Sequence, residues 1–222
     1  MKKLITAFMF LLSATAFAQN LQLHYDLGED RKYFTTTVEM FRPDEFGSTF
    51  FFVDLDYNGG NPANHNTKNV SLAYWEIARY VNVYKGLSVT AQYNDGTASG
   101  WPLGPIVLAG VSYPVNLGFV TLNTDLLYRK DFTSDGANAQ LTTTWFVPFL
   151  NGRVNFTGFM DIWTTKNPAK DKRDFVLLTE PQVWVNLINH VAIGTEIEIS
   201  NNFIPGENKV KVNPTIAAKW TF

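Results

Sequence analysis

The last thirteen residues of the chain alternate almost without fault between apolar and polar side chains. Val210, Val212, Ile216, Trp220 and Phe222 belong to the apolar set, and the residues between the members of this set are nearly all polar. A period of two over this length predicts an extended strand with one apolar and one polar face. If the apolar face contacts lipid, the polar face lines the interior of a membrane barrel.

The first eighteen residues have the pattern of a secretory signal peptide. Lys2 and Lys3 form a charged region, residues 4–12 are apolar, and Ala16–Ala18 is a small-x-small cleavage site. We therefore expect an exported mature chain that begins at Gln19. Removing the signal leaves 16 basic and 20 acidic residues, a net charge of −4. This charge, with no basic stripe, argues against nucleic-acid binding, and the absence of cysteine excludes disulfides and thiolate metal sites.

Turn signals divide residues 19–222 into twelve candidate strands, many of them approaching the roughly 9–11 residues that cross a bilayer when tilted. Short connections alternate with a set that is mostly longer and more polar, as in outer-membrane barrels with short periplasmic turns. The sequence therefore predicts one all-β domain, a twelve-stranded antiparallel transmembrane β-barrel. The predicted strands are residues 20–27, 32–42, 49–57, 70–84, 87–93, 105–115, 118–129, 139–150, 153–164, 174–185, 191–200 and 209–222.

Charged side chains fall almost wholly on one parity of these strands, which we assign to the lumen. Two strands do not follow the pattern. Glu76 and Arg79 lie on opposite parities of the fourth strand, so either a bulge shifts the register or one charge reaches a rim. The sixth strand is apolar on both faces. The predicted lumen-lining and solute-contacting residues are His24, Asp26, Glu39, Phe50, Phe52, Asp54, Asp56, Asp125, Arg129, Arg153, Phe159, Asp161, Trp163, Glu180, Gln182, Trp184, Glu196, Glu198, Lys211 and Lys219.

Tyrosines end four of the odd-numbered predicted strands, each on the outward parity: Tyr25, Tyr57, Tyr93 and Tyr128. Amphipathic rings at the membrane–water interface are typical of outer-membrane barrels. We therefore expect an aromatic girdle at the extracellular rim, and Tyr113, Trp220 and Phe222 at the periplasmic rim.

Two segments carry a resemblance to a known family. The segments 33–56, Y-F-T-T-T-V-E-M-F-R-P-D-E-F-G-S-T-F-F-F-V-D-L-D, and 74–95, with W-E-I-A-R and A-Q-Y-N-D, resemble early strands of the nucleoside-specific channel proteins of the outer membrane. The aromatic carboxy terminus at Phe222 resembles the terminal signature of bacterial outer-membrane barrels. These resemblances imply a Gram-negative outer membrane, insertion by the barrel-assembly machinery through Phe222, and a nucleoside as solute.

The expected function is passive diffusion of small hydrophilic solutes, without enzymatic activity and without a cofactor. Lumenal aromatic rings, among which we count Phe119, suit stacking on a nucleobase. Acidic groups suit ribose hydroxyls and disfavour phosphorylated solutes. Packing inside the barrel is the alternative role for each lumenal residue, with Glu198 and Lys211 as a possible cross-strand pair.

Two other functions remain open from the sequence. One is a plugged barrel with a structural role. The other is a lipid-modifying enzyme, which requires a nucleophile and a base such as His24. The remaining histidines, His65 and His190, are placed in a loop and a turn.

Overall fold

The computed structural model describes residues 19–29, 31–57, 70–133, 136, 138–167, 172–204 and 209–222. The expected signal peptide and the predicted loop that contains His65 lie outside the described residues. Within the described ranges the chain is built from β segments joined by turns and loops. No helix among these residues is long and apolar enough to cross a membrane.

Fourteen β segments form a single antiparallel sheet. They are β1 (Asn20–Asp26), β2 (Phe34–Asp44), β3 (Gly47–Tyr57), β4 (Val70–Tyr84), β5 (Leu87–Ala98), β6 (Trp101–Pro102), β7 (Ile106–Asn116), β8 (Thr121–Asp131), β9 (Asn138–Phe149), β10 (Val154–Asn167), β11 (Lys172–Thr179), β12 (Gln182–Ile188), β13 (Val191–Asn201) and β14 (Val210–Thr221).

These segments make twelve barrel strands. β6 is a two-residue addition that pairs only with the end of β5. β11 and β12 both pair with β10 and β13 in one continuous register, so they are two parts of one strand. Pro181 interrupts that strand because proline has no backbone N–H to donate to the ladder. The predicted strand at 174–185 is therefore longer than expected and broken at Glu180–Pro181.

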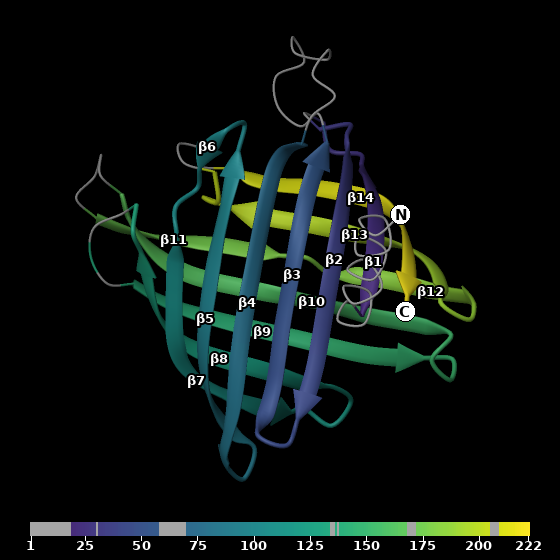
Figure 1. Ribbon diagram of the computed structural model, residues 1–222, viewed down its shortest axis with the longest axis horizontal. Helices are drawn as coiled ribbons and strands as arrows, with labels where there is room; N and C mark the ends of the chain where they lie inside the picture. Colours follow the sequence, from purple (N-terminus) through teal and green to yellow (C-terminus); the bar gives the residue numbers. More distant parts are fainter. Residues whose placement is uncertain are drawn as a thin grey trace, which may run out of the picture.

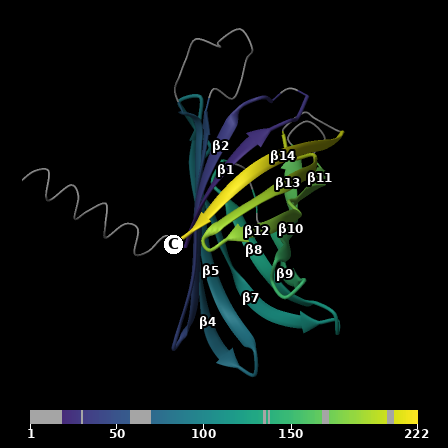
Figure 2. The same cartoon turned by 90° about the vertical axis from the view of Figure 1, so that its right-hand side faces the viewer.

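The sheet closes on itself because β1 pairs with β14, from Asn20 opposite Thr221 to Asp26 opposite Thr215. This pairing places the start of β1 and the end of β14 at the barrel end that carries the short turns, as an even strand number requires. Figure 1 shows the near wall (β1 to β5) crossing the far wall (β8 to β14) at a steep angle, as expected when all strands tilt around a barrel. Figure 2 shows the two walls from the side.

The outer surface is an apolar belt formed by alternate residues of every wall. Exposed members include Leu23 at 47%, Ile77 at 42%, Leu126 at 61% and Ile216 at 58% of their surface. An aromatic row crosses one rim, where Phe34 lies opposite both Tyr25 and Tyr57. The Tyr25 and Phe34 ring centroids are 5.0 Å apart. Such a belt with aromatic edges fits a lipid environment.

The register resolves the two strands that the sequence left ambiguous. No bulge separates Glu76 from Arg79, so Glu76 faces the interior and Arg79 faces outward. Arg79 lies near the short-turn end, where its guanidinium pairs with the Asp44 carboxylate. In β7, Leu108 and Ser112 are buried on the inner face while Val107 and Val111 are exposed outside.

One rim prediction is wrong. Tyr93 does not end its strand, because β5 continues to Ala98 and carries β6 beyond that point. Tyr93 instead packs against Trp75, with ring centroids 5.1 Å apart, and donates its hydroxyl hydrogen to Asp95. The predicted loop at 94–104 thus begins as strand, since backbone pairing with β4 persists through residues that resemble a turn.

We predict that charge on the belt destabilises the barrel according to depth. Ile77 lies at the middle of β4, so Ile77→Arg should lower the free energy of unfolding from lipid vesicles by about 2–4 kcal/mol. Val83 lies near the short-turn end of the same strand and is 59% exposed. Val83→Arg should cost about 0–1 kcal/mol. Equal costs in denaturant titrations would contradict an outer belt in lipid.

Candidate functional site

The inner face of the barrel carries the candidate site. The strand register and the contacts that cross the interior define the inward positions. The structure places the following predicted residues on this face: His24, Asp26, Glu39, Phe50, Phe52, Asp54, Asp56, Asp125, Arg129, Phe159, Asp161, Trp163, Glu180, Gln182, Trp184, Glu196, Glu198, Lys211 and Lys219.

Two residues expected inside the barrel lie elsewhere. Arg153 is exposed in the turn before β10, because positive φ angles at Leu150, Asn151 and Gly152 form that turn and the strand starts one residue later than predicted. Phe119 is 82% exposed in the connection between β7 and β8. The predicted strand 118–129 began too early, because β8 begins only at Thr121.

An ion-pair cluster occupies the interior at the end opposite the short turns. The Arg31 guanidinium lies 3.0 Å from Asp26 Oδ2 and donates two hydrogen bonds to the Glu198 carboxylate. Burial is the largest single effect on Arg31 and lowers its pKa, but Glu198, Tyr33 and Asp26 together raise the pKa by more, so the group stays charged. Glu198 lies opposite Asn213 in the register, and Lys211 lies opposite Ser200, so the proposed Glu198–Lys211 pair is not the register pair.

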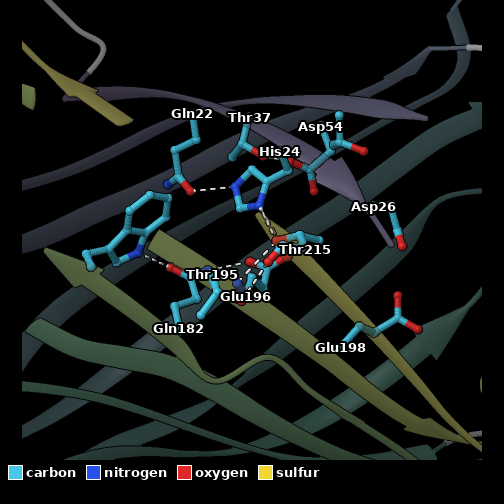
Figure 3. Close-up of polar contacts among 12 residues, drawn as sticks. Gln22, His24, Asp26, Thr37, Asp54, Gln182, Thr195, Glu196, Glu198 and Thr215 are labelled. Carbon is cyan, nitrogen blue, oxygen red and sulfur yellow. Dashed lines mark hydrogen bonds and ion pairs between the residues drawn. The ribbon is translucent and has the colours of Figure 1, made fainter. Parts of the chain in front are cut away.

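A second cluster fills the arc formed by β12, β13, β14 and β1. The His24 ring is 3% exposed and bonds Gln22 at 2.9 Å and Thr215 at 3.1 Å. It also meets Trp184, which is fully buried beneath the Lys219 ammonium, 4.0 Å above the indole ring. Figure 3 shows His24 held between Gln22 and Thr215, with Glu196 below it. His24 is therefore enclosed by packing and is assigned no catalytic role.

A third cluster fills the arc from β4 to β9. The Asp125 carboxylate accepts hydrogen bonds from Tyr80 at 2.8 Å and Gln92 at 3.0 Å, which joins β8 to β4 and β5 through the interior. Arg129 donates to Gln140 at 2.7 Å and lies 4.8 Å from the Trp163 ring centre. The fully buried residues Leu108 and Leu127 lie on the same inner face. This arc is consequently packed.

Between the two packed arcs lies a partly exposed strip with a strong excess of carboxylates, which we call the acidic track. It is formed by β3 and β4 on one side and by β10 to β13 on the other. Asp54 repels Glu180 and Glu196, and Glu76 repels Asp161, whereas Arg31 attracts Glu180 and Arg129 attracts Glu76 and Asp161. The acidic track consists of Asp54, Asp56, Glu76, Asp161, Glu180 and Glu196, all partly exposed.

Aromatic rings adjoin the acidic track. Phe52 contacts both Phe50 and Tyr74, with ring centroids 6.0 Å apart in each pair. Phe159 and Trp163 flank Asp161 on the inner face of β10 and are also partly exposed. The track therefore combines negative charge with aromatic surface.

Sequence reasoning missed several interior residues that matter to the site. Arg31 was assigned to a loop, and no pattern in that loop indicates that the side chain turns inward. Tyr74 and Tyr80 were missed because the register of strand four was left open, and Asn94 was missed because it was assigned to the loop at 94–104. Taking Glu76 as inward places both tyrosines on the inner face by period two, and pairing with β4 adds Asn94.

A family model described as a domain of unknown function, DUF5020, matches residues 18–222. The chain belongs to this family. Comparison with curated proteins finds no match. The DUF5020 match does not support the nucleoside-specific channel family that segments 33–56 and 74–95 resemble, so a nucleoside preference stays a prediction.

Solved structures share the fold of this DUF5020 member. The NanC porin is similar with a TM-score of 0.58 and 10% sequence identity, over 92% of this chain and 100% of that chain. The KdgM porin, solved in complex with disordered oligogalacturonate, is similar with a TM-score of 0.50 and 10% identity, over 92% and 99% of the two chains. At these identities the likeness establishes a common barrel fold and no common solute.

We predict that Arg31 and Glu198 are energetically coupled. Their side chains are 23% and 12% exposed, so loss of either leaves a shielded charge without its partner. A double-mutant cycle with Arg31→Met and Glu198→Gln should give a coupling of roughly 0.5–3 kcal/mol in the free energy of unfolding.

The Arg79–Asp44 pair is the matched control, because both of its side chains are more exposed, at 35% and 40%. A cycle with Arg79→Met and Asp44→Asn should give a smaller coupling, since water screens an exposed pair. Additive effects of Arg31→Met and Glu198→Gln would contradict the interior ion pair.

Proposed function

We propose that this protein is an outer-membrane channel for passive diffusion of small hydrophilic solutes. One observation carries the proposal: between two packed arcs, the interior of a closed barrel keeps a polar strip that is partly exposed, while the outer surface is apolar. A barrel that served only as a scaffold has no need for six acidic side chains gathered in its interior, because burying ionisable groups costs free energy.

The outer belt supports the location. Exposed Leu, Ile, Val and aromatic side chains surround the barrel, and backbone hydrogen bonds are closed within the sheet. Lipid provides no hydrogen-bond partners, so closed barrels are among the few structures that it accommodates. Export through residues 1–18 and insertion by the barrel-assembly machinery through Phe222 are parts of the same proposal.

The charge of the interior limits the solute. The acidic track repels anions, so the favoured solutes are neutral or cationic. The oligogalacturonate in the KdgM porin complex is a polyanion, and a solute of that kind suits this interior poorly. Similarity of fold and difference of solute are compatible because solute choice depends on lumenal side chains.

Nucleosides are the first neutral solutes to test. The partly exposed side chains of Phe52, Phe159 and Trp163 suit stacking on a base, and the neighbouring carboxylates suit ribose hydroxyls. The resemblance of segments 33–56 and 74–95 to nucleoside-specific channels supports the same choice. Weak contacts along the track would favour entry and still permit exit.

Planar-bilayer conductance of the purified protein tests the proposal. We expect steady conductance that adenosine reduces and a sugar of similar size does not. Conductance that neither solute affects would support the proposal of a channel and contradict the proposed preference for nucleosides. A folded barrel without conductance would overturn the channel and favour a structural role, and turnover of lipid would favour an enzyme.

Aromatic substitution gives a sharper prediction for nucleosides. Stacking on one aromatic ring contributes about 1–3 kcal/mol, so Trp163→Ala should weaken block by adenosine by roughly 5- to 150-fold. Phe46→Ala is the matched control, because Phe46 is 63% exposed in the short turn between β2 and β3. Equal adenosine sensitivity in both variants would remove Trp163 from the solute path.

A further inference from the structure

One arc of the outer surface changes from apolar to cationic at the rim opposite the short turns. The strands β8, β9, β10 and β11 are neighbours in this arc and lie side by side in the far wall (Figure 1). Two residues beyond the exposed Tyr128, β8 carries Lys130 on the same outward parity. β10 and β11 carry Lys166 and Arg173, which lie opposite each other in the register and are both exposed. We call Lys130, Lys166 and Arg173 the cationic row.

Below the cationic row, the outward side chains become less polar toward the middle of the barrel. In the first register row, the rings of Tyr128 and Phe175 are 53% and 68% exposed. They flank the smaller side chains of Ala139 and Thr164. The next register row is wholly apolar and consists of Leu126, Leu141, Ile162 and Leu177. Charge, then aromatic rings, then aliphatic side chains match the headgroup, interface and acyl chains of a lipid.

The Arg173 guanidinium is anchored at the rim. It donates a hydrogen bond to the amide oxygen of Asn138 at 2.5 Å, and the Thr164 hydroxyl lies 3.4 Å from the same oxygen. Asn138 is 4% exposed, so this anchor is fixed by packing. A guanidinium has five N–H donors, and arginine is well suited to bind phosphate through several of them at once.

Positive charge is concentrated on this arc of the rim. The carboxylates of Asp131 and Asp174 lie at inward positions of β8 and β11, away from the cationic row. The near wall differs, because the Lys32 ammonium donates to the Leu27 carbonyl oxygen at 2.6 Å and β5 carries Asp95 at an outward position. Short turns are periplasmic in outer-membrane barrels, so the cationic row lies at the level of the outer leaflet.

We propose that the cationic row and the two register rows below it bind a glycolipid of the outer leaflet that carries a phosphate at each end of a disaccharide headgroup. The cationic row extends over three strand spacings, about 14 Å, and such a headgroup has a comparable span. The apolar row crosses four strands, which suits several acyl chains on one headgroup. A phospholipid with one phosphodiester and two chains would contact only part of this surface. The site uses no lumenal residue and goes beyond the proposed channel.

Native mass spectrometry of the purified protein in detergent, titrated with bisphosphorylated lipid A, tests this site. We expect lipid A to bind at least about tenfold more tightly than the same lipid without its phosphates, and at least about tenfold more tightly than phosphatidylglycerol. The double variant Lys166→Gln and Arg173→Gln should bind lipid A at least about tenfold more weakly, because each cation beside an anionic headgroup adds to the attraction.

The double variant Lys85→Gln and Arg153→Gln is the matched control, because it removes the same charge from exposed side chains at the short-turn end. It should bind lipid A as the unmodified protein does. If the rim double variant does not fold, Lys166→Gln alone should weaken binding roughly fivefold.

Three results would overturn the proposal. One is equally tight binding of lipid A and of either comparison lipid, since the apolar belt or general attraction of anions would then suffice. Another is unchanged binding by the folded variants of the cationic row. The third is an equal loss in the short-turn control. Binding is measured without conductance, so its outcome does not depend on the channel.

Discussion

Hydrogen bonding between β1 and β14 joins the two ends of the chain, and the rest of the structure depends on that closure. An open sheet of this size would leave two rows of unpaired backbone groups, which neither lipid nor a soluble core tolerates. In the closed sheet, successive residues of each strand point to opposite faces, one toward the outside and the next toward the interior. The same backbone pairing therefore produces an apolar exterior and an interior rich in charge.

The polar groups of the interior fall into two sets, which differ in whether other side chains of the protein form hydrogen bonds with them and bury them. On two arcs, side chains such as His24 and Asp125 find protein partners and become buried. On the acidic track between them, carboxylates face one another across the lumen and remain partly exposed. The barrel is thus neither a fully packed core nor a uniformly lined tube, and this division is what supports the proposed channel.

Periodicity was sufficient to predict the barrel, the strand number and most inward residues. It failed where the backbone departs from a simple alternation. Pro181 breaks a strand without changing its register, and the strand limits at Arg153 and Tyr93 depend on turn geometry and on pairing with neighbours. The packing of individual side chains could not be predicted from the sequence. Arg31 is an example, because its partner Glu198 lies far away along the chain.

The Arg31 contact has a consequence for assembly. Arg31 follows the first strand, whereas Glu198 belongs to the penultimate one, and β14 lies between them. Their ion pair can therefore form only after the last strand has met the first. The ion pair crosses the junction of β1 and β14 on the inner side of the barrel. It therefore forms late and helps to hold the barrel closed at the one junction where the two strands are not joined by a turn.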